Sequence, residues 1–588
     1  MRRRSLPGKW SSLAFLSSLP RSIFTHRYAF WFLTLHLVPV FAALGLGVAL
    51  IALGQSGRML SLLLLSYVPF LAAQLTYLVL SGRWREYDRW FFTRWARMKD
   101  RIATVSTNVH LAAERLSTSQ QGGFLLTMAP ASFAIRTKAR KVIYRDDRHV
   151  SMIAGSRAGK GRDFIIPNLS HWRGSVIAYD PSGELVKATA RYRREVLGQR
   201  VIILDPFGIA GMESDQWNPM AEIDFDGDPL AVDQCYLLAE SLHFEQSPDP
   251  FWMHAPRKML ASVIGYVGTR SIPENCHLGM VRDLLMTSEP QALWLAMAQN
   301  DGLGGMLRRF GEANEHRHLE ELNSTMELAR TAMKWLDSPV MAAFSARSTF
   351  SMKQLKQEPT TIYIVMPAGM GRAYASWLRA LFNAAFDVMQ DASIAKPEED
   401  VLFLMDEFPV LGRMERIQQA AGEAAKFGVK LFICAQDITQ MKEHYGQSWE
   451  TFIANAGLLI MFANNDLETQ TYLSSRLGKE YYAKHSISTG SGAGASSSTS
   501  KTLELRDVAR PDQVGAQVSR QSGSAFFFIP GMKPMRLPRA SYDRWNMLQG
   551  YDAMPEREKE KKKVEVKRKP SRLAEMDMPS ETVPVAAE

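Results

Sequence analysis

The sequence contains few cysteines, and their spacing builds no covalent or metal-bound framework. Only three of its 588 residues are cysteine, and no two are spaced as a C-x-x-C pair. This scarcity argues against a disulfide framework and against a zinc site, and it fits a main body that lies in a reducing cytosol. Because 46% of the residues are apolar and 22% are charged, disorder throughout is excluded, and the length predicts two to four domains.

Acidic residues are outnumbered. The chain has 60 Asp and Glu against 70 Lys and Arg, which gives a formal net charge of +10 and a pI near 9.3. This basic balance favours acidic partners, such as nucleic acid or anionic lipid headgroups, without choosing between them. Much of the excess belongs to the flanks of the apolar N-terminal segments.

Two stretches near the N-terminus lack charge altogether. Residues 28–54 and 59–80 contain no Asp, Glu, Lys or Arg. Each is at least as long as the roughly 20 residues that a helix needs to cross about 30 Å of hydrocarbon. Because only four residues separate them, we expect a tight transmembrane hairpin within 28–81.

Basic residues flank this hairpin on both outer sides. Six Lys or Arg and no acidic residue precede it, and seven Lys or Arg lie between positions 83 and 101. The positive-inside rule therefore predicts a multi-pass protein with both termini in the cytoplasm. A cleaved signal peptide followed by a core helix is disfavoured, because the first run is too long and a second span follows it.

A glycine-rich segment follows the first strand candidate of the main body. The strand candidate covers 148–153, and the sequence AGSRAGKG at 154–161 leads into a partly apolar helical segment. A strand, a glycine loop and a helix form a phosphate-binding loop, in which backbone N–H groups and the helix N-terminus face the phosphates and a lysine reaches the terminal ones. The expected nucleotide contacts are Gly155, Ser156, Arg157, Ala158, Gly159, Lys160 and Gly161.

This segment departs twice from the pattern G-x-x-x-x-G-K-[ST]. Ala154 stands at the first position, and Gly161 stands at the last position, where it offers no hydroxyl to Mg²⁺. A glycine-rich strand-to-helix turn with an incidental lysine is the alternative interpretation of this segment, so a second motif has to decide.

The second motif is a pair of carboxylates at the end of an apolar strand. Residues 401–405 read VLFLM, and Asp406 and Glu407 follow directly. In an open α/β sheet such a pair lies in the crevice where ligands bind. In an ATPase Asp406 would hold Mg²⁺ through its water shell, and Glu407 would orient or deprotonate the attacking water. The alternative is a strand that ends in two solvated acids.

Further apolar strand candidates alternate with amphipathic stretches such as 374–389. This alternation predicts an α/β fold with a doubly wound, mostly parallel sheet. Gln436, at the end of one candidate, is placed either to sense a γ-phosphate or to satisfy a local turn. The strand candidates are 175–180, 200–205, 361–366, 429–437, 458–466 and 525–529.

Taken together, several blocks resemble the type IV coupling protein family, the membrane-bound RecA-like ATPases of conjugation and type IV secretion systems. The resemblance runs from the hairpin to about position 545. It implies a RecA-like P-loop nucleotide-binding domain with an inserted all-α domain, preceded by the transmembrane hairpin in the bacterial inner membrane. The blocks are AGSRAGKGRDFIIPNL, VIAYDPSGELVKATARYRR, QRVIILDPFG, DEFPVLGRME, CAQDITQMKEHYG and MFANNDLETQTYLSSRLGK.

The resemblance also assigns roles to particular residues. It implies ATP and Mg²⁺ as cofactors, with nucleotide contacts at Gly159 and Lys160. Asp406 is implied as the magnesium residue, and Asp180 and Glu184 would line the site. Ser182 stands where many family members have lysine. No single arginine is indicated as acting on a neighbouring subunit's nucleotide; the candidates are Arg413, Arg416 and Arg476.

The predicted domain organisation follows from these assignments. A basic cytoplasmic N-terminus (1–27) and the hairpin (28–81) precede a juxtamembrane linker that leads into the cytoplasmic domain (82–147). The C-terminal charged tail (546–588) could contact DNA phosphates or lipid, or only aid solubility. The remaining expected regions are the first segment of the nucleotide-binding domain (148–275), the inserted all-α domain (276–347), the second segment of the nucleotide-binding domain (348–545) with a flexible Ser/Gly loop (486–502), and a disordered charged tail (546–588).

The leading functional hypothesis is a homo-hexameric coupling ATPase. It would recruit relaxase-bound single-stranded DNA, effector proteins or both, and pass them to the channel components of a type IV secretion system. Two alternatives remain open at this point: a nucleotide-gated substrate receptor with little hydrolysis, motivated by Gly161, and a chromosome-segregation type DNA translocase.

Overall fold

The structure is a computed structural model of the chain, which divides into two units, 1–107 and 108–588. It describes residues 116–117, 122–129, 140–243, 249–287, 290–315, 317–420, 422, 424–489 and 497–552. The predicted transmembrane hairpin (28–81) lies outside these residues, as does most of the predicted tail. Within the described part of the chain, no helix is both long enough and apolar enough to span a bilayer.

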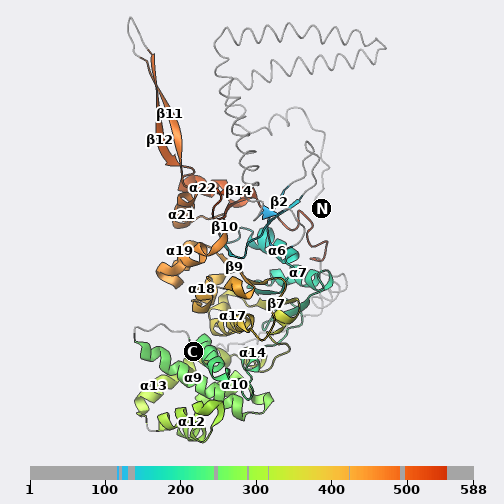
Figure 1. The fold of residues 1–588 in the computed structure, drawn as a ribbon, viewed down its shortest axis with the longest axis vertical. Coiled ribbons are helices and arrows are strands. Elements are labelled where there is room, and N and C mark those ends of the chain that lie inside the picture. Colours follow the sequence, from blue (N-terminus) through green and yellow to red (C-terminus); the bar gives the residue numbers. More distant parts are fainter. Residues whose placement is uncertain are drawn as a thin grey trace, which may run out of the picture. The chain divides into compact units, whose positions relative to one another are not determined.

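A nine-stranded sheet organises the second unit (Figure 1). Its strand order is β14-β13-β10-β4-β9-β8-β5-β7-β6, and the seven strands from β10 to β6 are parallel. β13 and β14 add an antiparallel edge. The strands are β4 (His149–Ala154), β5 (Val176–Asp180), β6 (Arg200–Leu204), β7 (Thr360–Val365), β8 (Val401–Met405), β9 (Val429–Ala435), β10 (Ala456–Phe462), β13 (Ser524–Phe528) and β14 (Met535–Pro538).

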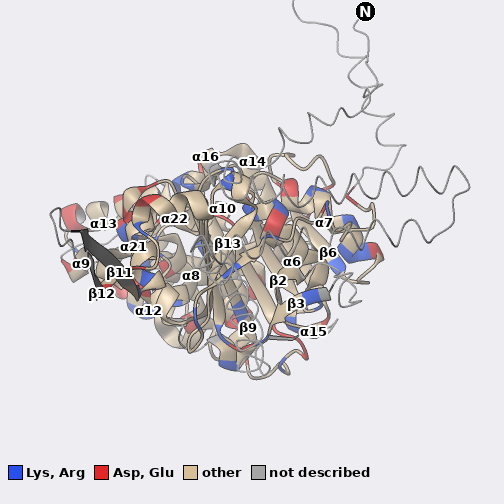
Figure 2. Cartoon of the chain, turned by 90° about the horizontal axis from the view of Figure 1, so that it is seen from above, with Lys and Arg blue, Asp and Glu red and all other residues tan. Residues whose placement is uncertain are grey.

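The central strands of this sheet are buried on both faces. Every residue of β4, β8, β9 and β10 is buried, which is the pattern of a parallel sheet covered by helices on each side. Figure 2 shows mostly uncharged residues along the central strands and residues of both charges on the helices and loops around them. The predicted α/β class, the mostly parallel sheet and the predicted strands of this sheet are confirmed.

Aspartate caps start two of the helices that follow these strands. The Asp437 side chain, just after β9, accepts a hydrogen bond from the Gln440 N–H at 2.9 Å. Asp466, after β10, accepts one from the Thr469 N–H at 2.8 Å. Such caps satisfy N–H groups that have no partner within the helix. The helices around the sheet are α6 (Ile166–His171), α7 (Glu184–Glu195), α16 (Ala368–Gly371), α17 (Ala375–Gln390), α18 (Glu415–Ala420), α19 (Ile438–Tyr445), α20 (Thr451–Ala454), α21 (Leu467–Leu477) and α22 (Pro511–Gln517).

Short helical turns connect these elements. They are η1 (Gly161–Ile165), a π-helical turn, and the 3-10 turns η5 (Phe408–Leu411), η6 (Ala424–Phe427), η7 (Gly446–Glu450) and η8 (Arg520–Ser522).

Between β6 and β7, the described residues form helices and loops but no strand. α9 packs against α10, α12 and α13, and α8 packs against both α9 and α17 of the sheet domain. The helices α8 and α9 precede position 276, where the sequence analysis places the start of the all-α domain (276–347), and that boundary stays a prediction. The elements between β6 and β7, most of them green in Figure 1, are η2 (Pro219–Glu222), α8 (Ala231–Leu242), α9 (Pro250–Arg270), η3 (Pro273–Asn275), α10 (Leu278–Leu285), α11 (Pro290–Ala298), α12 (Gly302–Glu315), α13 (Leu319–Met333), η4 (Lys334–Asp337), α14 (Pro339–Phe344) and α15 (Gln354–Gln357).

The described residues of this unit also form two smaller sheets. The first is antiparallel and contains β1 (Leu116–Ser117), β3 (Arg140–Tyr144) and β2 (Phe124–Ala129). The second is a two-stranded ribbon of β11 (Lys479–Thr489) and β12 (Ser497–Asp507), paired from Lys479 with Asp507 to Thr489 with Ser497. The predicted flexible loop (486–502) is therefore mostly paired strand. Its serines and threonines can extend the ladder that the preceding Tyr and Leu residues begin, because strand pairing uses backbone groups.

A fully buried arginine joins several segments at the amino edge of the sheet. Arg193, near the end of α7, uses all five of its N–H donors. They go to the backbone oxygens of residues 169, 172 and 174 and to the side chains of Gln199 and Thr361. Burial lowers its pKa to about 10. Arg193 therefore connects the end of the loop helix α6 to the starts of β5, β6 and β7.

Candidate functional site

The glycine loop joins the end of β4 to the π-helical turn η1. A Cβ at Gly155 would lie 2.4 Å from the Ala463 carbonyl oxygen at the end of β10, so a side chain there is excluded. Gly159 has φ of +98°, a conformation that favours glycine. The Asp163 N–H donates to the Gly159 oxygen at 2.9 Å and starts the helical path. The local backbone structure therefore explains why glycine occupies both positions.

The two departures from the phosphate-loop pattern have different structural settings. Ala154 is the last residue of β4 and is fully buried, so it precedes the turn and does not shape it. Gly161 opens η1, and a Cβ there would meet only Leu185 Cδ2, at an ordinary 3.9 Å. The surroundings of Gly161 therefore leave room for a small side chain.

The order of the strands brings the predicted site residues together. β9 lies between β4 and β8, so the carboxyl ends of these three neighbours carry the loop, Gln436 and the two carboxylates. Lys160 Nζ lies 3.4 Å from Glu407 Oε2, with each side chain 12% exposed. Gln436 Nε2 donates to the same oxygen at 2.9 Å. Lys160, Glu407 and Gln436 thus form one polar cluster.

Asp406 lies beside this cluster with an unused acceptor. Its Oδ1 is buried and accepts no hydrogen bond from the described residues. Burial raises the pKa of Asp406 to about 6; Lys160 opposes this shift, whereas the charges of Glu407, Asp180 and Glu184 add to it. A buried carboxylate oxygen without a partner, next to a lysine, is a fitting ligand for a divalent cation or its water shell.

Asp180 and Glu184 occupy the next strand end, after β5. Asp180 is fully buried. Its Oδ2 accepts a hydrogen bond from the Val186 N–H at 2.9 Å, and its Oδ1 accepts one from the Ser182 hydroxyl at 3.3 Å. Burial raises its pKa. Asp180 therefore caps α7, while the exposed Glu184 contributes only a nearby negative charge.

The candidate arginines have partners within the same chain. Arg413 lies 3.3 Å from Glu415, and Arg416 forms an ion pair with Asp387 of α17. The Arg476 guanidinium lies over the Tyr472 and Phe528 rings, 5.7 and 5.9 Å from their centroids. These positions do not single out one arginine as acting on a neighbouring subunit.

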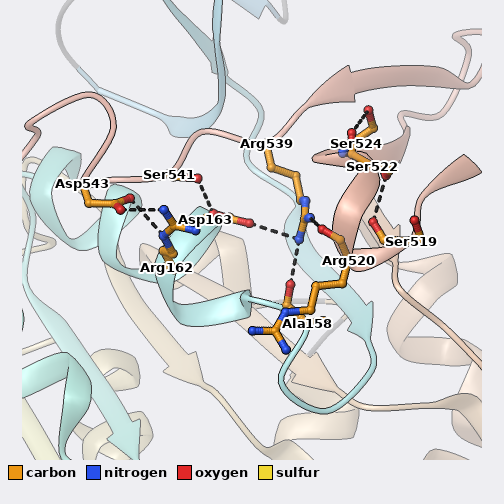
Figure 3. Close-up of polar contacts among 10 residues, drawn as sticks. All are labelled: Ala158, Arg162, Asp163, Ser519, Arg520, Ser522, Ser524, Arg539, Ser541 and Asp543. Carbon is orange, nitrogen blue, oxygen red and sulfur yellow. Dashed lines mark hydrogen bonds and ion pairs between the residues drawn. The ribbon is translucent and has the colours of Figure 1, made fainter. Parts of the chain in front are cut away.

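The sequence analysis missed a group of residues behind the loop (Figure 3). Arg539, just after β14, donates to the Ala158 carbonyl at 2.7 Å and pairs with Asp163 Oδ2 at 3.0 Å. Ser541 Oγ donates to Asp163 Oδ1 at 2.6 Å. Because Arg539 lies 381 residues after Ala158, at the end of a short polar strand, no local pattern indicates this contact.

The donor set fits a nucleoside polyphosphate with Mg²⁺. A glycine loop supplies backbone N–H groups at a helix start, Lys160 supplies a positive charge, and Asp406 and Glu407 supply oxygen ligands for a hard cation. Among the described residues, no group of three or more His, Cys, Asp and Glu side chains gathers to form a metal site of its own. The fold and the site together define an α/β protein with a P-loop-like glycine loop at the carboxyl edge of its parallel sheet.

Sequence comparison identifies the family. Residues 95–569 match the family described as type IV secretory system conjugative DNA transfer, so the chain belongs to it. It is 26% identical over 385 residues to the conjugal transfer protein TraG of Escherichia coli and 25% identical over 398 residues to the protein VirD4 of Rhizobium radiobacter. These matches cover 62% and 67% of this chain, and 60% and 57% of those relatives.

Structural comparison gives the same fold. The unbound conjugative coupling protein TrwB, without its N-terminal segment, superposes with a TM-score of 0.53 at 15% identity and covers 72% of this chain and 89% of its own. TrwB in complex with a non-hydrolysable ATP analogue superposes with a TM-score of 0.50 at 15% identity, covering 67% of this chain and 86% of its own. The large parallel sheet with its inserted helices is therefore the fold of a coupling protein.

Proposed function

We propose that this chain is an inner-membrane coupling ATPase, which takes substrate in the cytoplasm and passes it to a type IV secretion channel. One observation carries the proposal: Lys160 and Gln436 converge on Glu407 at the carboxyl edge of the sheet, beside an Asp406 oxygen without a partner among the described residues. Membership of the conjugative DNA transfer family and the fold of TrwB, which binds an ATP analogue, support it.

Each residue of the cluster has a task in this proposal. The loop N–H groups and Lys160 bind the phosphates, so Lys160 exchanges its contact with Glu407 for one with the ligand. Asp406 holds the waters around Mg²⁺, which supplies charge neutralisation at the phosphates when it is bound. Glu407 orients the attacking water and accepts its proton, and Gln436 holds the Glu407 carboxylate in place through the 2.9 Å contact.

The remaining features extend the same proposal. The apolar segment 28–81 anchors the chain in the inner membrane as a hairpin, with both termini in the cytoplasm. The chain assembles as a homo-hexamer, and an arginine of one subunit completes the site of the next. The cargo is relaxase-bound single-stranded DNA, effector protein or both. The helical segment between β6 and β7, which includes the predicted all-α domain (276–347), contacts that cargo.

Gly161 favours a second candidate function, a nucleotide-gated receptor that hydrolyses little ATP. Without a hydroxyl after Lys160, the site lacks the ligand that usually holds Mg²⁺ at this position. In this case nucleotide binding would open or close the cargo surface, and turnover would be negligible.

ATP turnover by the full chain in lipid nanodiscs, with and without single-stranded DNA, tests the proposal. We expect turnover that rises with DNA and is abolished in Lys160→Ala. Lys442→Ala is the control, because Lys442 pairs with Glu468 on the surface and both side chains are more than 40% exposed. DNA affinity should fall steeply with salt, because phosphate contacts release counterions. Nucleotide binding without turnover would support the receptor, and an absence of nucleotide binding would contradict both functions.

A further inference from the structure

The back of the nucleotide loop contacts a segment from the far end of the chain. Arg539 follows β14, and its side chain is 5% exposed. Its Nη1 contacts the Ala158 oxygen and Asp163 Oδ2, while its Nη2 donates to the Arg520 carbonyl at 2.6 Å. Figure 3 shows these contacts from one guanidinium to the loop, to the first helical turn and to the neighbouring segment.

The contact with Ala158 fixes the direction of a loop N–H. Within a trans peptide unit the C=O and the N–H point in opposite directions. Arg539 holds the Ala158 carbonyl toward the back of the loop, so the N–H of Gly159, which belongs to the same peptide unit, is directed away from Arg539. That N–H is one of the donors on which a phosphate-binding loop depends.

The contact with Asp163 compensates a negative charge that lies behind the loop. A Cβ placed on Gly159 would lie 3.1 Å from Asp163 Oδ2, so this carboxylate lies against the loop itself. Its side chain is 7% exposed and is therefore poorly screened by water. A negative charge in this position repels phosphate oxygens bound on the other side of the loop unless a cation compensates it. Arg539 is the cation that pairs with it.

The adjacent residue provides a comparison within the same two segments. Arg162 pairs with Asp543 at 2.5 Å, but these side chains are 48% and 45% exposed. An exposed pair of this kind contributes about 0 to 1 kcal/mol, because water and salt screen it. The two segments therefore make one ion pair in water and one buried directly behind the loop.

We propose that Arg539 is a positioning residue for the nucleotide site, which orients the Gly159 N–H and cancels the charge of Asp163 behind the bound phosphates. This assignment rests on the proposed nucleotide-binding function and adds to it a residue from the C-terminal end of the sheet. It couples nucleotide affinity to the packing of 539–543, directly before the charged tail.

The test measures the affinity of a fluorescent ATP analogue for the full chain in nanodiscs, together with KM and kcat. The variants are Arg539→Met, Asp163→Asn, the double variant and Asp543→Asn. We expect Arg539→Met to weaken affinity about tenfold or more, because it leaves an unpaired buried carboxylate beside the phosphates. The double variant should recover about threefold or more of that loss, because Asn carries no charge. Asp543→Asn should stay within about twofold of the parent.

Removal of the Asp163 charge separates positioning from simple packing. A side chain that only fills space would not be rescued by this removal, so a folded double variant without recovery overturns the assignment, as does an Arg539→Met variant with parental affinity. If Arg539→Met does not fold, Asp163→Asn alone decides. We expect equal or tighter nucleotide binding, and weaker binding would contradict the charge argument. Failure of the parent chain to bind nucleotide would instead overturn the proposed function.

Discussion

Both edges of the parallel sheet carry buried charged side chains, and the two edges differ in how fully these side chains are bonded. At the amino edge, all five donors of Arg193 are used. Lys430, at the start of β9, donates to the Asp146 carbonyl and lies 5.6 Å from the Tyr144 ring centroid. At the carboxyl edge, Lys160 has a long contact with Glu407, and Asp406 has a buried oxygen that no described residue uses.

This difference separates structure from function. A buried charge whose donors all meet backbone or side-chain acceptors holds the fold together, and burying it without those partners would be costly. A buried charge with unused capacity costs stability in the free protein and is retained where a ligand supplies the missing partner. Arg193, whose five donors are all used, is therefore a structural residue of the amino edge, and we assign ligand binding to the carboxyl edge.

Arg193→Met gives the largest expected effect and tests the structural edge. The variant removes five hydrogen bonds and leaves buried acceptors unpaired, so we expect a loss of about 3 to 5 kcal/mol of stability or a failure to fold. Differential scanning fluorimetry measures it. The control is Arg200→Met, because Arg200 forms an exposed pair with Glu358 at 3.4 Å and should change stability by less than about 1 kcal/mol. Equal melting temperatures for both variants would contradict the comparison.

Glu407→Gln tests the carboxyl edge through its chemistry. The amide keeps the size of the side chain but cannot accept the proton of the attacking water, so we expect kcat to fall by about 10² to 10⁴ while the variant still folds and binds ATP. Steady-state turnover and a nucleotide-binding assay measure the two quantities. A variant with parental kcat would remove Glu407 from the catalytic role.

Gly161→Ser gives the smallest expected effect. The position has room for a side chain, since the nearest atom to an added Cβ is 3.9 Å away. A hydroxyl there adds one ligand for Mg²⁺. Because a contact of about 1 kcal/mol corresponds to a factor of about five, we expect half-maximal turnover at an about fivefold lower Mg²⁺ concentration. Magnesium titration of the turnover rate measures it. A higher half-maximal Mg²⁺ concentration in the variant would indicate that the cation is held differently in this chain.

The sequence predicted the parallel sheet because most of its strands are apolar runs that end in a polar or glycine-containing turn. The runs at β4, β8 and β9 were sufficient to place the loop, the two carboxylates and Gln436 at strand ends. Neighbouring parallel strands then bring these residues together, which the contacts of Glu407 with Lys160 and Gln436 show.

The features that were missed have no local signal. Arg539 contacts the loop from the end of a strand of four residues, β14, whose alternation is too short to be recognised. Residues 486–502 are rich in Ser and Gly, and this composition suggested a loop, although 486–489 pair with 497–500.

Asp406→Asn tests the central claim most directly, because the claim predicts opposite signs for stability and turnover. The folded-state pKa of about 6 exceeds the ordinary 3.8, so the folded state binds more protons than the unfolded state between these values and stability falls as pH rises through that interval. At pH 7.5 without nucleotide, the Asn variant should therefore be about 1 to 3 kcal/mol more stable than the parent and should melt at a higher temperature. This gain in stability should disappear below about pH 4.

We expect Asp406→Asn to abolish ATP turnover, because Asn provides no carboxylate for the waters around Mg²⁺. Melting temperature and turnover are measured on one preparation of the full chain. A more stable and inactive variant is the predicted result. A variant that keeps its turnover, or that melts earlier than the parent at pH 7.5, would contradict the assignment of the carboxyl edge as the ligand-binding edge.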